Sequence, residues 1–169
     1  MDNADALKQI LKDMDTVAKA LGVEPFSIYF LGGSACILGG YSDRMTRDFD
    51  FVDLDYPAHY GRVLRYLNDF DMLEYESTIL APSYQERAIR LNEFQYLNIF
   101  ILSREDIIVS KIIRMEEKDL DDMDRMIGAS DKKLILKIID EVLSREHLYP
   151  SKKNAFLQKL PEFRRRYNV

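Results

Sequence analysis

The feature that most constrains this chain is a short apolar run that ends in two glycines and a serine. Residues 26–31 read F-S-I-Y-F-L, a composition typical of a buried β-strand, and Gly32, Gly33 and Ser34 follow directly. Glycine lets a backbone come close to a phosphate group, and Ser34 adds a hydroxyl donor. The alternative is a tight strand-to-helix turn that binds nothing. No Gly-Lys-Ser/Thr sequence follows, which excludes a Walker-type phosphate loop.

Two aspartates spaced by one residue follow this turn. Residues 47–54 predict a second strand, in which alternation places Phe49 and Phe51 on one face and Asp48 and Asp50 on the other. Acids beside a buried face are costly unless a cation compensates them. Mg²⁺ suits such a pair, because it takes one or two protein carboxylates and completes its shell with water and phosphate oxygens. We therefore predict a Mg²⁺ or Mn²⁺ site here; the alternative is a solvated edge strand.

Three further charged residues are candidates for the same site. Arg47, just before the acid pair, could reach a phosphate or balance the nearby acids. Lys111 lies on a predicted helix, from which its ammonium group could neutralise a triphosphate. Asp119 and Asp122 are three residues apart and therefore share one helix face. The alternative for Lys111 and Asp119 is a surface helix laced with ion pairs.

Composition limits the partners that the chain can have. Its 169 residues, 47% hydrophobic and 31% charged, suffice for one domain, or for a small domain with a helical appendage. No apolar run approaches the ~20 residues of a membrane span, and the first residues are acidic, so we expect no membrane partner. The single Cys36 fits a reducing cytoplasm. The net charge of −5 argues against wrapping by nucleic acid. The run Arg164, Arg165 and Arg166 is typical of a solvated tail, with a local RNA contact as the alternative.

Hydrophobic periodicity predicts an α+β fold, with strands dominating the middle of the chain and helices its last third. We expect a mixed sheet with flanking helices from residues 1–102, and a C-terminal helical section, residues 103–169, packed on the same body. The predicted strands cover residues 26–31, 47–54, 72–75, 77–81, 87–91 and 95–102. The predicted helices cover residues 4–21, 34–38, 57–70, a segment from 104, 119–127, 131–144 and 152–159, with breaks at Gly128 and Pro150.

These residues resemble the signature of the nucleotidyltransferase superfamily related to DNA polymerase beta. That signature is a hydrophobic residue, Gly, Gly or Ser, a gap of about nine to thirteen residues, and D-x-D or D-x-E on a strand. Leu31–Ser34 and Asp48-Phe49-Asp50 match it. The stretch T-R-D-F-D-F is similar to small bacterial members. L-S-R-E-D-I-I-V-S-K-I-I-R, followed by K-D-L-D-D-M, resembles toxin-like members from abortive-infection systems. The resemblance covers residues 26–125.

The resemblance implies a nucleotidyltransferase-like fold and a reaction. The reaction is transfer of a nucleoside monophosphate from a nucleoside triphosphate to a hydroxyl group, with pyrophosphate leaving. By this match, Gly32, Gly33 and Ser34 would hold the triphosphate, while Asp48 and Asp50 would ligate two divalent ions.

The same resemblance extends to the later residues and to the partners. Lys111 would contact phosphate, and Asp119 would line the acceptor side. The acceptor would be an RNA, such as a tRNA, or a protein. The toxin-like members suggest a toxin or antitoxin component that acts in the cytoplasm.

The chain departs from the family pattern where a third carboxylate is expected. Members carry that acid on a later strand, where it activates the attacking hydroxyl; the matching strand here, Q-Y-L-N-I-F, presents Asn98. Asparagine can ligate a metal, but it is neutral and a poor base. Glu93 could substitute, and Glu116 stands where toxin-like members carry an arginine. Two alternatives therefore remain: a catalytically silent nucleotide- or RNA-binding module, and a small-molecule nucleotidyltransferase, which the short chain disfavours.

Overall fold

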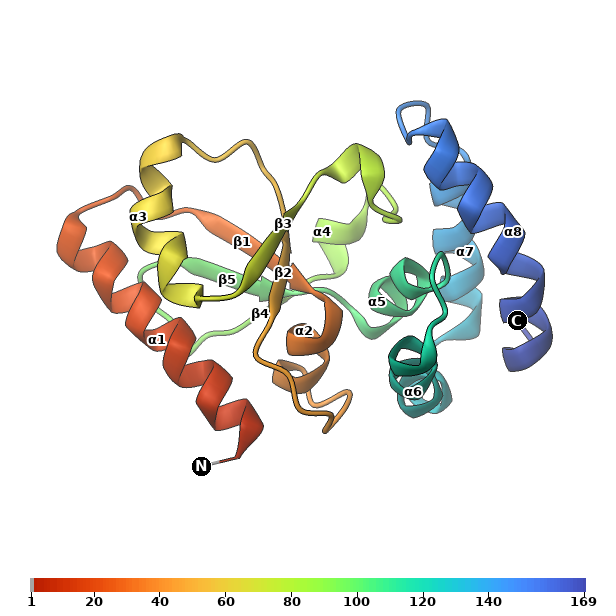
Figure 1. Cartoon of the computed structure of the whole chain (residues 1–169), viewed down its shortest axis with the longest axis horizontal. Coiled ribbons are helices and arrows are strands. Elements are labelled where there is room, and N and C mark those ends of the chain that lie inside the picture. Colours follow the sequence, from red (N-terminus) through yellow and green to blue (C-terminus); the bar gives the residue numbers. More distant parts are fainter. Residues whose placement is uncertain (1) are drawn as a thin grey trace. The chain divides into compact units, whose positions relative to one another are not determined.

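A computed structural model describes residues 2–169, which divide into two compact units (Figure 1). The first contains the chain up to Leu73 together with Ala88–Leu102, and the second contains Glu74–Arg87 and Ser103–Val169. The predicted division at residues 102/103 differs from these units in one segment, Glu74–Arg87. A five-stranded mixed sheet and a helical C-terminal part confirm the predicted α+β class.

The first unit is built on a mixed sheet with the strand order β3-β2-β1-β5-β4. Strand β1 pairs in parallel with β5 and antiparallel with β2, while β3 adds to β2 in parallel and β4 adds to β5 antiparallel. The strands are β1 (Ser27–Leu31), β2 (Phe49–Val52), β3 (Phe70–Leu73), β4 (Ile89–Arg90) and β5 (Asn98–Ile101). Because β2 runs antiparallel to β1, the start of β2 lies beside the end of β1, where the glycine turn begins.

Aromatic side chains form the core on one face of this sheet. Phe30, Phe49 and Phe51 are fully buried, and the Phe30 ring centroid lies 5.4 Å from that of Phe49 and 5.9 Å from that of Phe51. Burying a side chain of this size contributes about 1.5–3 kcal/mol each. The core therefore fixes the face to which β2 turns its phenylalanines, and Asp50 faces the other way.

Three helices complete the first unit. The first, α1 (Asn3–Leu21), is capped by Asp2 and ended by Gly22 in the left-handed conformation, and it packs against α2 and α3. Helix α2 (Gly32–Leu38) follows β1 directly. The helix predicted over residues 57–70 is wrong in its continuity. That segment is a 3₁₀ turn (Ala58–Tyr60), one α-turn called α3 (Gly61–Leu64) and a second 3₁₀ turn (Arg65–Leu67).

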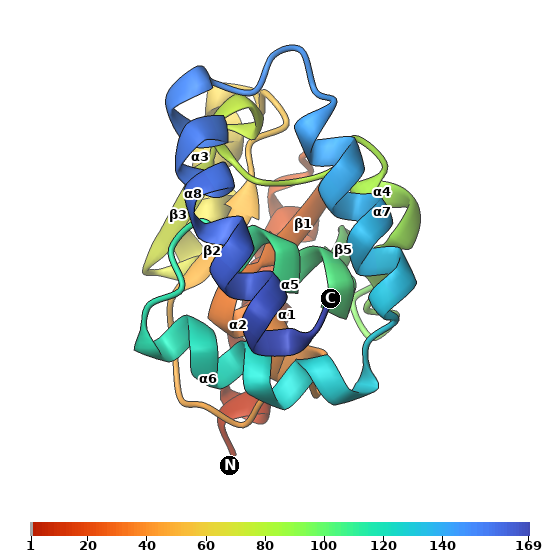
Figure 2. The same cartoon turned by 90° about the vertical axis from the view of Figure 1, so that its right-hand side faces the viewer.

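Helices make up most of the second unit (Figure 2). They are α4 (Tyr84–Arg87), α5 (Arg104–Lys111), α6 (Glu117–Met126), α7 (Lys132–Leu143) and α8 (Pro150–Tyr167), with 3₁₀ turns at Tyr75–Ser77 and Ile127–Ala129. The predicted strand at 77–81 is absent from the segment that the structure describes there. The predicted break between the last two helices covers residues 144–149, and Pro150 itself is the first residue of α8, because proline at the first helical position sacrifices no hydrogen bond. Between residues 2 and 169, no helix combines the length and apolar character needed to cross a membrane.

Candidate active site

The two aspartates of the D-x-D motif lie where β2 begins. Asp48 directly precedes the strand and is exposed, while Asp50 is its second residue and is half-buried. The fully buried Phe49 and Phe51 hold this part of the chain to the core. The predicted strand 47–54 is therefore shorter than expected, but its two phenylalanines are buried as the alternation predicted.

Gly32 makes room for the side chain of Asp50. Leu31 and Asp50 are partners in the β1–β2 register, so Asp50 sits beside the end of β1. The backbone of Gly32 has φ +73°, and a Cβ placed there would lie 3.2 Å from Cγ of Asp50 and collide with its Oδ2. A positive φ and this collision both require glycine. The glycine turn and the acid pair are thus parts of one site.

Gly33 makes room for a second charged side chain, that of Arg44. A Cβ on Gly33 would lie 3.3 Å from Cζ of Arg44 and 3.3 Å from Cγ2 of Thr46, and it would collide with the Arg44 guanidinium nitrogen. The motif analysis did not select Arg44. Arg44 lies four residues before Asp48 in the sequence, but no local pattern indicates that its side chain reaches Gly33.

Ser34 ties the glycine turn to the acid-bearing loop. It is fully buried, and its hydroxyl donates a short hydrogen bond to the main-chain carbonyl of Asp48. That hydroxyl hydrogen is therefore used within the protein, so Ser34 holds Asp48 in place. Arg47, the predicted phosphate contact, is exposed on the segment before Asp48.

A further carboxylate, which the motif analysis missed, lies next to the acid pair. Asp71 of β3 is the register partner of Asp50, and both side chains therefore lie on the same face of the sheet. A pocket of about 340 Å³ adjoins these acids, and it is lined by Asp48, Asn68, Asp69, Phe70 and Asp71. In the sequence, Asp71 stands in the pattern F-D-M-L, an acid between apolar residues. The predicted strand 72–75 begins two residues after the observed start of β3 at Phe70 and therefore leaves Asp71 out.

Neither candidate for the third acid lies at this site. Asn98 is the β5 partner of Ser27, whereas Asp50 is opposite Leu31, four residues further along β1 and roughly 13 Å away along the strand. Glu93 is exposed and pairs with Lys8 at 3.5 Å. The expectation that Asn98 occupies the third-acid position is therefore wrong, because the pairing of β5 with β1 puts Asn98 at the opposite end of β1 from Asp50. Asp71 is the later-strand carboxylate beside Asp50.

The acids fit a hard divalent cation that shares its shell with a ligand. Across residues 2–169, no three or more histidine, cysteine or acidic side chains are grouped closely enough to hold a metal ion by themselves. Mg²⁺ is commonly held by one or two carboxylates together with water and substrate phosphates. Asp48 and Asp50 are acids of this kind, and the Gly32 backbone leaves the space that Asp50 needs.

Lys111 and Asp119 belong to a buried ion cluster of the second unit. The Lys111 ammonium lies 3.1 Å from Oδ2 of Asp122 and 3.5 Å from Oδ1 of Asp119, and all three side chains are at most 7% exposed. Arg114 donates two hydrogen bonds to Asp119, at 2.7 and 2.8 Å. Burial raises the pKa of Asp119, but the Arg114 hydrogen bonds and the Lys111 charge outweigh it and lower that pKa overall. The ion pairs of the predicted alternative are present, but they are buried and do not lie on a surface helix. A role of Lys111 and Asp119 toward substrate stays a prediction.

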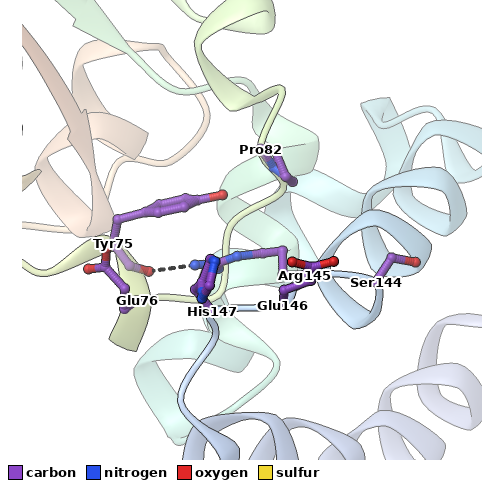
Figure 3. Close-up of a pocket in the computed structure, with 7 residues that line it drawn as sticks. All are labelled: Tyr75, Glu76, Pro82, Ser144, Arg145, Glu146 and His147. Carbon is purple, nitrogen blue, oxygen red and sulfur yellow. Dashed lines mark hydrogen bonds between the residues drawn. The ribbon is translucent and has the colours of Figure 1, made fainter.

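A separate pocket of about 430 Å³ lies within the second unit (Figure 3). Its main feature is Arg145, whose Cζ lies 3.9 Å from the centroid of the Tyr75 ring. The guanidinium donates to the main-chain carbonyls of Tyr75, Thr78 and Leu80 at 2.8–3.0 Å. Arg145 thus links the segment after β3 to the residues that directly follow α7. The pocket is lined by Tyr75, Glu76, Pro82, Ser144, Arg145, Glu146 and His147.

The sheet, the glycine turn and the D-x-D strand together define a nucleotidyltransferase-type unit. Over residues 5–167 the chain matches the family described as "Nucleotidyltransferase of unknown function" (DUF6036), and it belongs to that family. The match confirms the superfamily inferred from the motif. It also supports a general nucleotidyl-transfer function, with a nucleoside triphosphate as substrate. Comparison with curated proteins and with solved structures found no match.

Proposed function

We propose that this protein transfers a nucleoside monophosphate from a nucleoside triphosphate to a hydroxyl of an RNA or a protein, in a reaction that needs Mg²⁺ or Mn²⁺. The observation that carries the proposal is the contact between Gly32 and the Asp50 carboxylate, with Ser34 holding Asp48 alongside. The match to a nucleotidyltransferase family supports the same reaction class.

In this reaction the acceptor oxygen attacks the α-phosphorus and forms a new P–O bond. The bond between the α-phosphorus and the bridging oxygen breaks, and pyrophosphate leaves with the electron pair. Divalent cations, when bound, would supply stabilisation of the negative charge that develops during the transfer. Asp48 and Asp50 would hold these cations, and Asp71, the register partner of Asp50, would accept the proton of the acceptor hydroxyl.

Label transfer tests the proposal directly. The protein is incubated with Mg²⁺, cell extract and each of the four nucleoside triphosphates, labelled either on the α- or on the γ-phosphate. We expect the α-label, and not the γ-label, to enter RNA or protein. An Asp48→Asn, Asp50→Asn variant should lose transfer while it unfolds at the wild-type temperature. Transfer of the γ-label would instead indicate phosphoryl transfer and would refute the proposal.

The alternative is a nucleotide-binding module of the same fold without turnover. One observation favours it: the acids do not form a group of three that could hold a metal alone, among the residues described. Thermal unfolding separates the two functions. A module without turnover shows a nucleotide- and Mg²⁺-dependent rise in melting temperature, because binding stabilises the native state, but transfers no label.

A role as a toxin or antitoxin component is the most specific part of the proposal. It rests on the resemblance of T-R-D-F-D-F and K-D-L-D-D-M to small bacterial and toxin-like nucleotidyltransferases. A toxin of this class should arrest growth when its expression is induced in a bacterial host. The Asp48→Asn, Asp50→Asn variant should not. Equal growth of cultures that express the two proteins to the same level would contradict a toxin role.

A further inference from the structure

The two glycines of the turn each accommodate a different charged side chain. Gly32 leaves space for the Asp50 carboxylate, and Gly33 leaves space for the Arg44 guanidinium. Gly33 has no left-handed φ, so backbone strain does not explain the need for glycine there. What a side chain at Gly33 would displace is the head group of Arg44. The turn is thus flanked by one negative and one positive group.

The backbone around Arg44 is held in place by several hydrogen bonds. The main-chain N–H groups of Tyr41 and Ser42 donate to the carbonyl of Cys36 at 2.7 and 3.1 Å. The Asn3 side chain donates to the Arg44 carbonyl at 3.1 Å, and the Arg44 N–H donates to the Ser42 hydroxyl at 3.2 Å. Such anchoring reduces the entropy lost when the guanidinium binds a ligand. These hydrogen bonds fix the main chain from which the Arg44 side chain extends to the glycine turn.

The charge of the site calls for a cationic group of this kind. Asp48, Asp69 and Asp71 line one pocket, and Asp50 adjoins them, so a polyphosphate bound there would meet four carboxylates. Divalent cations bound there would offset part of this repulsion. A guanidinium adds a fixed positive charge and a planar fork of donors that matches phosphate oxygens.

We propose that Arg44, and not the exposed Arg47, is the arginine that binds the polyphosphate of the nucleotide, and that Gly33 is glycine to admit it. The inference rests on the proposed function, because it assigns the ligand of the same site. Arg44 and Asp50 both have interaction partners within the protein. A merely structural Arg44 would affect unfolding but would not discriminate ligands by their number of phosphates.

The test measures binding by calorimetry, with inorganic tripolyphosphate, ATP and AMP as probes, each with and without Mg²⁺. Arg44→Met should weaken tripolyphosphate and ATP binding in Mg²⁺ roughly 10- to 100-fold, as expected for loss of hydrogen bonds to a charged group, and AMP binding much less. Arg44→Lys should restore part of the affinity, because it returns the charge without the fork. Arg62→Met, at an exposed position of α3, is the matched control and should bind as the wild type does.

Gly33→Ala provides an independent check. The new methyl group would displace the far end of a flexible side chain, so the variant should fold. It should weaken tripolyphosphate binding by itself, and combining it with Arg44→Met should add little further loss, because both changes remove the same contact. Additive losses in the double variant would argue that Gly33 acts independently of Arg44.

The possible results separate this inference from the proposed function. Wild-type affinity in Arg44→Met, or a large loss in Arg47→Met instead, overturns the inference while nucleotide transfer can still occur. Absence of tripolyphosphate and ATP binding by the wild type overturns it as well. Tripolyphosphate binding that depends on Arg44, in a protein that transfers no nucleotide, supports the inference and refutes only the transfer reaction.

Discussion

Replacing Lys111 with methionine tests whether the buried ion cluster is a structural element. The change removes the ammonium that lies 3.1 Å from Asp122 and 3.5 Å from Asp119, both of which are at most 1% exposed. At an effective dielectric constant of about 20, the shorter pair alone has a Coulomb energy of about 5 kcal/mol. Removing one partner of a buried pair typically costs about 3–5 kcal/mol. We expect the free energy of unfolding to fall by that amount.

Urea denaturation followed by circular dichroism measures this loss, with Lys118→Met as the control. Lys118 is exposed on the same helix as Asp119, so its replacement should change stability by less than about 0.5 kcal/mol. Adding Asp122→Leu to Lys111→Met should recover part of the loss, because it removes the buried carboxylate whose charge Lys111 offsets. A loss below about 1 kcal/mol in Lys111→Met would refute the structural role. A stable but inactive Lys111→Met would support the predicted contact with phosphate.

Three other substitutions give further expected outcomes. Gly32→Ala should destabilise the protein by about 1–3 kcal/mol and abolish nucleotide binding, whereas Gly61→Ala, where a Cβ meets nothing within 4 Å, should be neutral or slightly stabilising in thermal unfolding. Arg145→Met should cost about 2–4 kcal/mol in urea denaturation, since it leaves three carbonyls without a charged donor; a smaller loss than 1 kcal/mol would contradict this. Burial, together with the hydrogen bond to Asp124, raises the pKa of Tyr167 to about 12. The contribution of Tyr167 to the free energy of unfolding should therefore be constant below the unfolded pKa of about 10 and fall as the pH rises toward 12, and Tyr167→Phe should remove this alkaline step.

Local patterns in the sequence predicted the parts of the site that are close in the chain. The run F-S-I-Y-F-L, the glycine turn and the alternation of Phe49 and Phe51 each carry a local signal of burial or backbone freedom. The structure has strands at the two apolar segments and the first turn of helix α2 at the glycines. The family match supports the same reading of the motif.

The parts that the sequence did not predict depend on which strands become neighbours. The assignment of Asn98 to the acid site assumed that β5 lies beside the acids, but β5 pairs with β1 and places Asn98 at its far end. Asp71 was overlooked because β3 is a short, mostly exposed edge strand, which has weak alternation. The helix predicted over residues 152–159 was too short, because α8 continues through Pro161 to Tyr167. Local periodicity does not determine which strands become neighbours or how tertiary packing stabilises an element.

The membership of Glu74–Arg87 in the second unit has a consequence for dissecting the protein. The polypeptide passes from one unit to the other three times, after Leu73, Arg87 and Leu102, so a single cut cannot release either half intact. A fragment ending at residue 102 would keep this stretch but lose Arg145, along with the Asp106 side chain that Arg87 grips through two hydrogen bonds. We therefore expect this protein, when the residues after 102 are removed, to aggregate or unfold locally, whereas a circularly permuted chain that preserves all three passages should not.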